Sequence, residues 1–131
     1  SGHNPHGKAW NIGISKPVDD TLAVNRELDT IISVTDMGMA TSGNYRNFYI
    51  KDGRKVAHTI DPFTCTPVSH SLLSATVLAP TCAYADALAT SMMVMGLDSA
   101  KALVSRLPNV QAFLIYQAQD GSLRTCKVSG I

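Results

Sequence analysis

The chain has 131 residues, enough for one domain with its own hydrophobic core or for half of a larger domain. Apolar residues make up 45% of the chain and charged residues 16%, a mixture that excludes a disordered acidic or basic tail. The formal net charge is +1, without the basic excess typical of proteins that bind nucleic acid or anionic membranes. No apolar run approaches the roughly 18 residues that a membrane-spanning helix needs.

The cysteines and the first residue narrow the possible classes of protein further. Cys65, Cys82 and Cys126 are far apart and form no CxxC pair, which argues against a structural zinc site, and their odd number argues against a disulfide framework. The chain starts with Ser1 and no signal peptide follows, so we expect it to begin inside a longer product or after a removed tag. The charged fraction is below the usual value of about 25%. We therefore expect further chain or a partner to cover part of the surface.

The N-terminal half predicts strands. Residues 10–14 (WNIGI) alternate between apolar and polar, and Pro17 ends that strand. Residues 30–35 (TIISVT) are rich in β-branched side chains. Residues 45–51 and 54–60 flank Asp52-Gly53, a dipeptide typical of hairpin turns.

The C-terminal half predicts two helices between strands. A strand at residues 71–78 ends before Pro80, and residues 83–95 then have helical spacing, with Thr81 as N-cap and Gly96 as C-terminal stop. A second helix is expected from Asp98, as its cap, to Arg106. Two strands, residues 112–117 and 123–128, close the chain. Because the strands are segregated from the helices, the sequence predicts an α+β fold with a mainly antiparallel sheet and both helices on one face.

The first candidate site is residues 40–47 (ATSGNYRN), where small hydroxyl residues surround a glycine after a predicted strand. Backbone N–H groups and hydroxyls in such a stretch can bind a phosphate, and Arg46 would add a forked donor. The alternative is a glycine-containing turn with solvated side chains, which composition alone favours.

The second candidate is residues 58–62 (HTIDP). Histidine is the side chain best suited to moving a proton near neutral pH, and Asp61 would orient the His58 imidazole or hold a metal ion. The alternative is a surface histidine on a strand followed by an ordinary Asp-Pro turn.

The third candidate is Asp86 with Thr90, which are four residues apart and share one face of the first predicted helix. Cys82, Ala89 and Met93 make up the rest of that face, so a carboxylate there would need a partner such as Mg²⁺. The alternative is that Asp86 caps a neighbouring loop while Thr90 bonds back to its own helix.

These stretches, in this order, resemble the FAD:protein FMN transferase family, also called the ApbE family. The matching segments are residues 7–14 (GKAWNIGI), 40–47 (ATSGNYRN), 58–68 (HTIDPFTCTPV) and 85–96 (ADALATSMMVMG). The resemblance implies an ApbE-like, T-fold-like α+β domain of which residues 1–131 are the C-terminal portion.

The resemblance also implies an activity. Members of the family transfer the FMN half of FAD to a Thr or Ser hydroxyl of a target protein, release AMP and require Mg²⁺. By motif, Asp86 and Thr90 match the metal ligands, His58 the catalytic base and Asp61 its support. The residues that match the stretch beside the cofactor and its diphosphate are Thr41, Ser42, Gly43, Tyr45 and Arg46.

The sequence also departs from the family. Members are longer, and their N-terminal portion supplies much of the flavin pocket, so we expect the isolated chain to fold without transferring FMN. Cys65 stands where a glycine is usual, and Asn44 where an aspartate is common. Family members in bacteria are mostly anchored at the periplasmic face of the inner membrane, which gives the expected location. A flavin- or nucleotide-binding module without turnover and a purely structural α+β domain remain alternatives.

Overall fold

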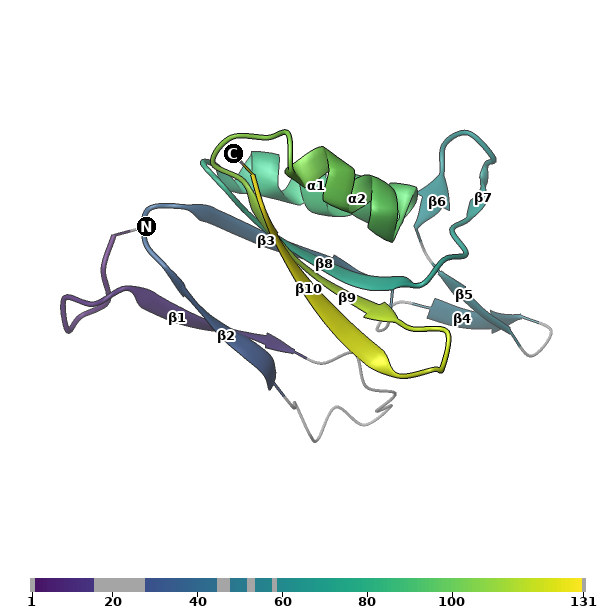
Figure 1. The fold of residues 1–131 in the computed structure, drawn as a ribbon, viewed down its shortest axis with the longest axis horizontal. Coiled ribbons are helices and arrows are strands. Elements are labelled where there is room, and N and C mark those ends of the chain that lie inside the picture. The colour runs from purple at the N-terminus through teal and green to yellow at the C-terminus, as the bar shows by residue number, and fades with distance from the viewer. Residues whose placement is uncertain (1, 16–27, 45–47, 52–53, 58, 131) are drawn as a thin grey trace.

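A four-stranded antiparallel sheet with the strand order β10-β9-β8-β3 is the centre of the computed structural model (Figure 1). The structure describes residues 2–15, 28–44, 48–51, 54–57 and 59–130. The four strands are β3 (Gly38–Gly43), β8 (Leu72–Ala79), β9 (Gln111–Gln117) and β10 (Leu123–Ser129). Helices α1 (Cys82–Met95) and α2 (Leu97–Val104) cover one face, α1 over β3 and β8 and α2 over β9 and β10. The predicted α+β fold is confirmed.

The other strands form antiparallel pairs. The pairs are β1 (Trp10–Ser15) with β2 (Leu28–Val34), β4 (Phe48–Lys51) with β5 (Arg54–Ala57), and β6 (Ile60–Asp61) with β7 (Thr66–Pro67). The strand predicted over residues 54–60 is wrong in its extent, because β5 ends at Ala57 and Ile60 pairs with Pro67 instead. Pro62 lacks an N–H and favours this early reversal of the chain.

The sequence does not predict β3, because the composition of residues 40–47 indicates either a phosphate-binding stretch or a glycine-containing turn. Glycine and alanine are poor strand formers, so β3 has little intrinsic preference for this conformation. Its pairing with β8 and the packing of α1 impose it. A Cβ atom on Gly38 would lie 2.2 Å from the backbone nitrogen of Cys82, so only glycine allows this approach of strand and helix.

The ends of α1 are set by the residues that the sequence predicted. The hydroxyl of Thr81 accepts a hydrogen bond of 3.3 Å from the N–H of Tyr84, and Gly96 ends the helix with a φ of 82°. The prediction that Asp98 caps α2 is wrong. Gly96 is the N-cap, because it directly precedes Leu97, the first residue of that helix. Asp98 lies in the first turn, where its negative charge interacts favourably with the positive end of the helix dipole.

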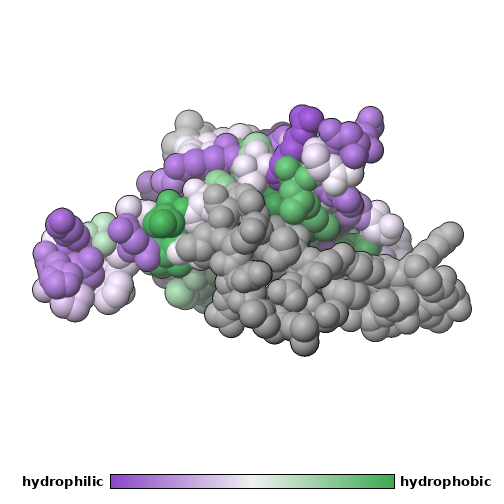
Figure 2. Space-filling view, turned by 90° about the horizontal axis from the view of Figure 1, so that it is seen from below, coloured by the Kyte–Doolittle hydropathy of each residue, from purple (hydrophilic) through white to green (hydrophobic). Residues whose placement is uncertain are grey.

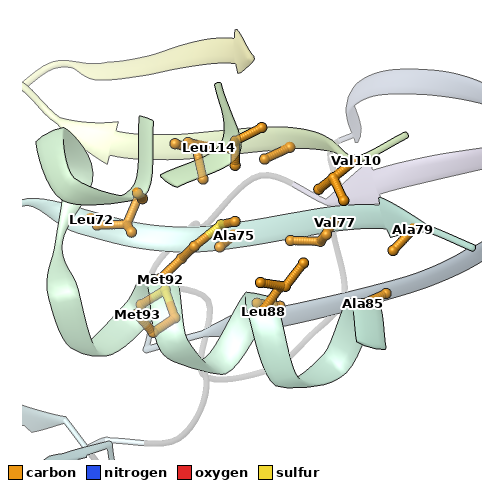
Figure 3. Close-up of a cluster of buried hydrophobic side chains, with 14 residues drawn as sticks. Leu72, Ala75, Val77, Ala79, Ala85, Leu88, Met92, Met93, Val110 and Leu114 are labelled. Carbon is orange, nitrogen blue, oxygen red and sulfur yellow. The ribbon is translucent and has the colours of Figure 1, made fainter. Parts of the chain in front are cut away.

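The core lies between the helices and the sheet (Figure 3). Its small residues on β8 and α1, among them Ala75 and Ala89, let the helix approach the strand closely, and the flexible side chains of Met92 and Met93 fill the remaining space. The buried side chains of this cluster are Leu72, Ala75, Val77, Ala79, Ala85, Leu88, Ala89, Met92, Met93, Ala100, Val104, Val110, Ala112 and Leu114. This core holds β3 and α1, the elements that carry two of the candidate motifs, in a fixed relation.

The β1–β2 pair leaves apolar side chains exposed, on the side of the sheet away from the helices (Figures 1 and 2). Trp10 is 44% exposed and Ile31 63%. The expectation that further chain or a partner covers part of the surface stays a prediction. Within the described residues, no helix has the length and apolar character that a membrane crossing requires.

Candidate functional site

The three candidate motifs meet near the end of β3. The hydroxyl oxygens of Ser42 on β3 and Thr90 on α1 are 3.2 Å apart. The hydroxyl of Thr59 donates a hydrogen bond of 3.0 Å to the side-chain oxygen of Asn44, the residue after β3. One strand end is therefore in contact with both the helical motif and the motif that contains Asp61.

Asp86 and Thr90 are both exposed, one turn apart on α1. The prediction that Asp86 lies on an apolar face and needs a partner to offset burial is therefore wrong. Ala89 and Met93 turn into the core, whereas Asp86 faces outward. The carboxylate keeps its hydration and is accessible to a ligand.

Thr41 and Ser42 point to opposite faces of the sheet, because successive side chains alternate along a strand. The Thr41 hydroxyl lies 2.9 Å from that of Thr76 on β8. Ser42 points toward α1, as its contact with Thr90 shows. These two neighbouring hydroxyls cannot line one surface, and Ser42 is the one that joins the candidate site.

Residues 41–43 belong to a strand at the edge of the sheet rather than to a free loop. Gly43 pairs with Ser74 of β8, so part of this backbone is already hydrogen-bonded and is not free to bind a phosphate. The predicted cofactor-binding residues Tyr45 and Arg46 lie outside the described residues, as does His58.

Asp61 organises the turn between β6 and β7. Its carboxylate accepts a hydrogen bond of 2.8 Å from the N–H of Phe63, and its carbonyl oxygen accepts one of 2.8 Å from the N–H of Cys65. Phe63 is 94% exposed at this turn. Asp61 thus stabilises its own loop. Its role as a support for His58 stays a prediction.

Cys65 adopts a φ of 54°, in the left-handed region that glycine tolerates best. The loop therefore adopts a conformation that would suit the glycine which the resemblance implies at this position. We expect Cys65→Gly to raise the free energy of unfolding by about 0.5–1 kcal/mol, because relief of the left-handed strain exceeds the entropy that glycine adds to the unfolded chain. Urea denaturation measures the change. Cys65→Ala keeps the Cβ atom, so a similar gain in that variant would contradict the explanation.

No group of three or more His, Cys, Asp or Glu side chains in the described part of the chain is placed to bind a metal ion. A cation at Asp86 would therefore need oxygen ligands of other kinds. Two candidates are the hydroxyl of Thr90, one turn further along α1, and that of Ser42 on β3, which lies 3.2 Å from it.

Comparison with known proteins confirms the family resemblance. Residues 1–114 match the model of the ApbE family. An FAD:protein FMN transferase of Salmonella typhimurium is 40% identical over 120 residues, which are 92% of this chain and 33% of that protein. One from Haemophilus influenzae is 41% identical over 120 residues, which are 92% of this chain and 34% of that protein. The chain therefore spans about a third of the length of these curated relatives.

Solved structures share the fold. The apo form of the flavinyl transferase ApbE of Pseudomonas stutzeri superposes with a TM-score of 0.74 at 32% identity, over 97% of this chain and 37% of that chain. The flavin transferase ApbE of Vibrio cholerae gives a TM-score of 0.75 at 33% identity, over 98% of this chain and 38% of that chain. The sheet with its two helices is thus a part of the flavin transferase fold. This chain belongs to the ApbE family.

Proposed function

We propose that this chain supplies part of the active site of an FAD:protein FMN transferase, as the C-terminal portion of a single flavin-transferase domain. The observation that carries the proposal is the contact between motifs at the end of β3, where Ser42 meets Thr90 and Asn44 meets Thr59. The names of the similar proteins point to the same activity. The partners are FAD, a target protein and the remainder of the transferase, and the proposed location is the periplasmic face of the inner membrane.

The proposed reaction moves FMN from FAD to a Thr or Ser hydroxyl of the target. The hydroxyl oxygen forms a bond to the phosphorus on the FMN side of the diphosphate, and the bond from that phosphorus to the bridging oxygen breaks, so that AMP leaves. The proton of the hydroxyl passes to a base, for which we propose His58. Such a transfer depends on alignment of the groups and on stabilisation of the phosphate charge.

The exposed oxygens of Asp86 and Thr90 fit a hard divalent cation, and Ser42 stands beside Thr90 as a third oxygen or as an orienting partner. When bound there, Mg²⁺ would supply charge neutralisation for the diphosphate. Ser42 would hold the Thr90 hydroxyl in one orientation. Asp61 fixes its own turn through Phe63, and we propose it as the support of His58.

The decisive experiment incubates the full-length protein with FAD, Mg²⁺ and a flavin-accepting target. Covalent flavin fluorescence on the target, together with AMP in equal amount, is the expected result. FAD binding without either product would favour the alternative of a binding module, and no FAD binding at all would favour a structural domain.

We expect His58→Asn in the full-length protein to lower the rate of transfer by at least about 10²-fold, because a positioned base contributes that much. FAD binding and the melting temperature should stay near the parental values. The transfer rate, FAD binding and the melting temperature are measured together. Loss of the melting transition would mean that His58 stabilises the fold instead of taking the proton.

A further inference from the structure

Thr59 is held from two directions at the start of the loop that carries Asp61. Its hydroxyl donates a hydrogen bond of 3.0 Å to the Asn44 side-chain oxygen, in a partly buried position. Its carbonyl oxygen accepts a hydrogen bond of 3.1 Å from the N–H of Val68, which follows β7. Thr59 is joined covalently to His58, and Asp61 is two residues further on. The bond between Asn44 and Thr59 therefore ties the end of β3 to the start of the loop that carries Asp61.

Asn44 is itself fixed to the sheet. Its N–H donates a hydrogen bond of 3.0 Å to the carbonyl oxygen of Leu73 on β8. Ser42, two residues earlier on the same strand, lies 3.2 Å from Thr90. Strand β3 therefore positions both Ser42, which contacts Thr90, and Asn44, which directly follows the strand.

We propose that Asn44 is a positioning residue, which acts through Thr59 to fix residues 59–61 relative to Ser42 and Thr90. The inference rests on the transferase function proposed above. A misplacement of about 1 Å in such a site can cost about 10²-fold in rate. Asp61 and the proposed cation ligands lie on different segments, so a bond between these segments sets their separation.

The test compares matched variants of the full-length protein in the transfer assay. Asn44→Ala and Thr59→Val each remove the bond, and we expect each to lower kcat about tenfold, with the KM for FAD changed by less than about threefold. Asn44→Asp keeps an acceptor and Thr59→Ser keeps a donor, so we expect both to retain most of the parental kcat. Because Asn44→Ala and Thr59→Val remove the same bond, the double variant should be hardly slower than either single variant.

Hydrogen exchange at the Val68 amide, which donates to Thr59, supplies a readout that is independent of activity. We expect exchange there to be faster in Asn44→Ala and unchanged in Asn44→Asp, with the amides of β8 protected in both. An Asn44→Ala variant with parental kcat, or additive losses in the double variant, would overturn this inference alone. A parental protein that binds FAD without transferring FMN would instead overturn the proposed function, and the role of Asn44 with it.

Discussion

Gly38→Ala is expected to destabilise the chain severely. A Cβ atom at this position would lie 2.2 Å from the nitrogen of Cys82 and 2.3 Å from the carbonyl carbon of Thr81. Both are backbone atoms at the start of α1, so no side-chain rotation relieves the overlap. Either α1 must move away from β3, which would open the core, or the pairing of Gly38 with Ala79 must break.

The expected loss in free energy of unfolding is more than about 3 kcal/mol, the upper range for over-packed cores. In a thermal melt followed by circular dichroism this corresponds to a fall in Tm of at least about 10 °C. Gly7→Ala is the matched control, because a Cβ atom there meets nothing within 4 Å although its φ is +71°. That control should cost only about 1–2 kcal/mol from its left-handed backbone. A Gly38→Ala variant no less stable than the control would show that α1 approaches β3 less closely.

The elements that follow local rules could be predicted from the sequence. The start and end of α1 follow from the Thr81 hydroxyl and the positive φ of Gly96, both of which are local properties. The strand pairing around residues 52–53 likewise follows from a turn signal between two apolar stretches, and β4 and β5 pair as expected. The predicted start of α2 at Asp98 is wrong by only a few residues. Gly96, which ends α1, is also the N-cap of α2.

What could not be predicted depends on partners far away in the chain. β3 has the composition of a turn, and it becomes a strand because β8 pairs with it and α1 packs on it. Without knowing that residues 41–43 are a strand, one cannot know that Thr41 and Ser42 face opposite sides. The exposure of Asp86 also depends on which helix face the sheet covers, and the spacing of Asp86 and Thr90 leaves that choice open.

The contact of Asn44 with Thr59 also depends on residues that are distant in the sequence. The sequence gives no signal for it, because a carboxamide and a hydroxyl 15 residues apart carry no periodic pattern. Order along the chain nevertheless predicted that the three motifs belong together, through the resemblance to the ApbE family. The structure adds the specific contacts by which Ser42 and Asn44 reach the other two motifs.

Asp86→Asn in the full-length protein is expected to lower Mg²⁺-dependent transfer of FMN about 10³-fold. Asparagine has nearly the shape of aspartate, so the change removes the negative charge and little else. A ligand that loses its charge binds a hard cation less tightly, and charge stabilisation of this kind supplies several kcal/mol, at about 1.4 kcal/mol per tenfold in rate. The fold should be unaffected, because Asp86 is exposed and makes no side-chain hydrogen bond to another described residue.

The control is Asp98→Asn, which removes the same charge from an exposed position in the first turn of α2. It should leave transfer near the parental rate and reduce stability only by the dipole contribution of about 0.3–1 kcal/mol. A titration with Mg²⁺ then separates weakened cation binding from other causes, since Asp86→Asn should recover part of its rate at high Mg²⁺ and Asp98→Asn should keep the parental dependence on Mg²⁺. Near-parental transfer by Asp86→Asn at low Mg²⁺ would mean that the cation is held elsewhere. The hydroxyls of Thr90 and Ser42 would then be left without the charge that makes a pair of neutral oxygens into a cation site.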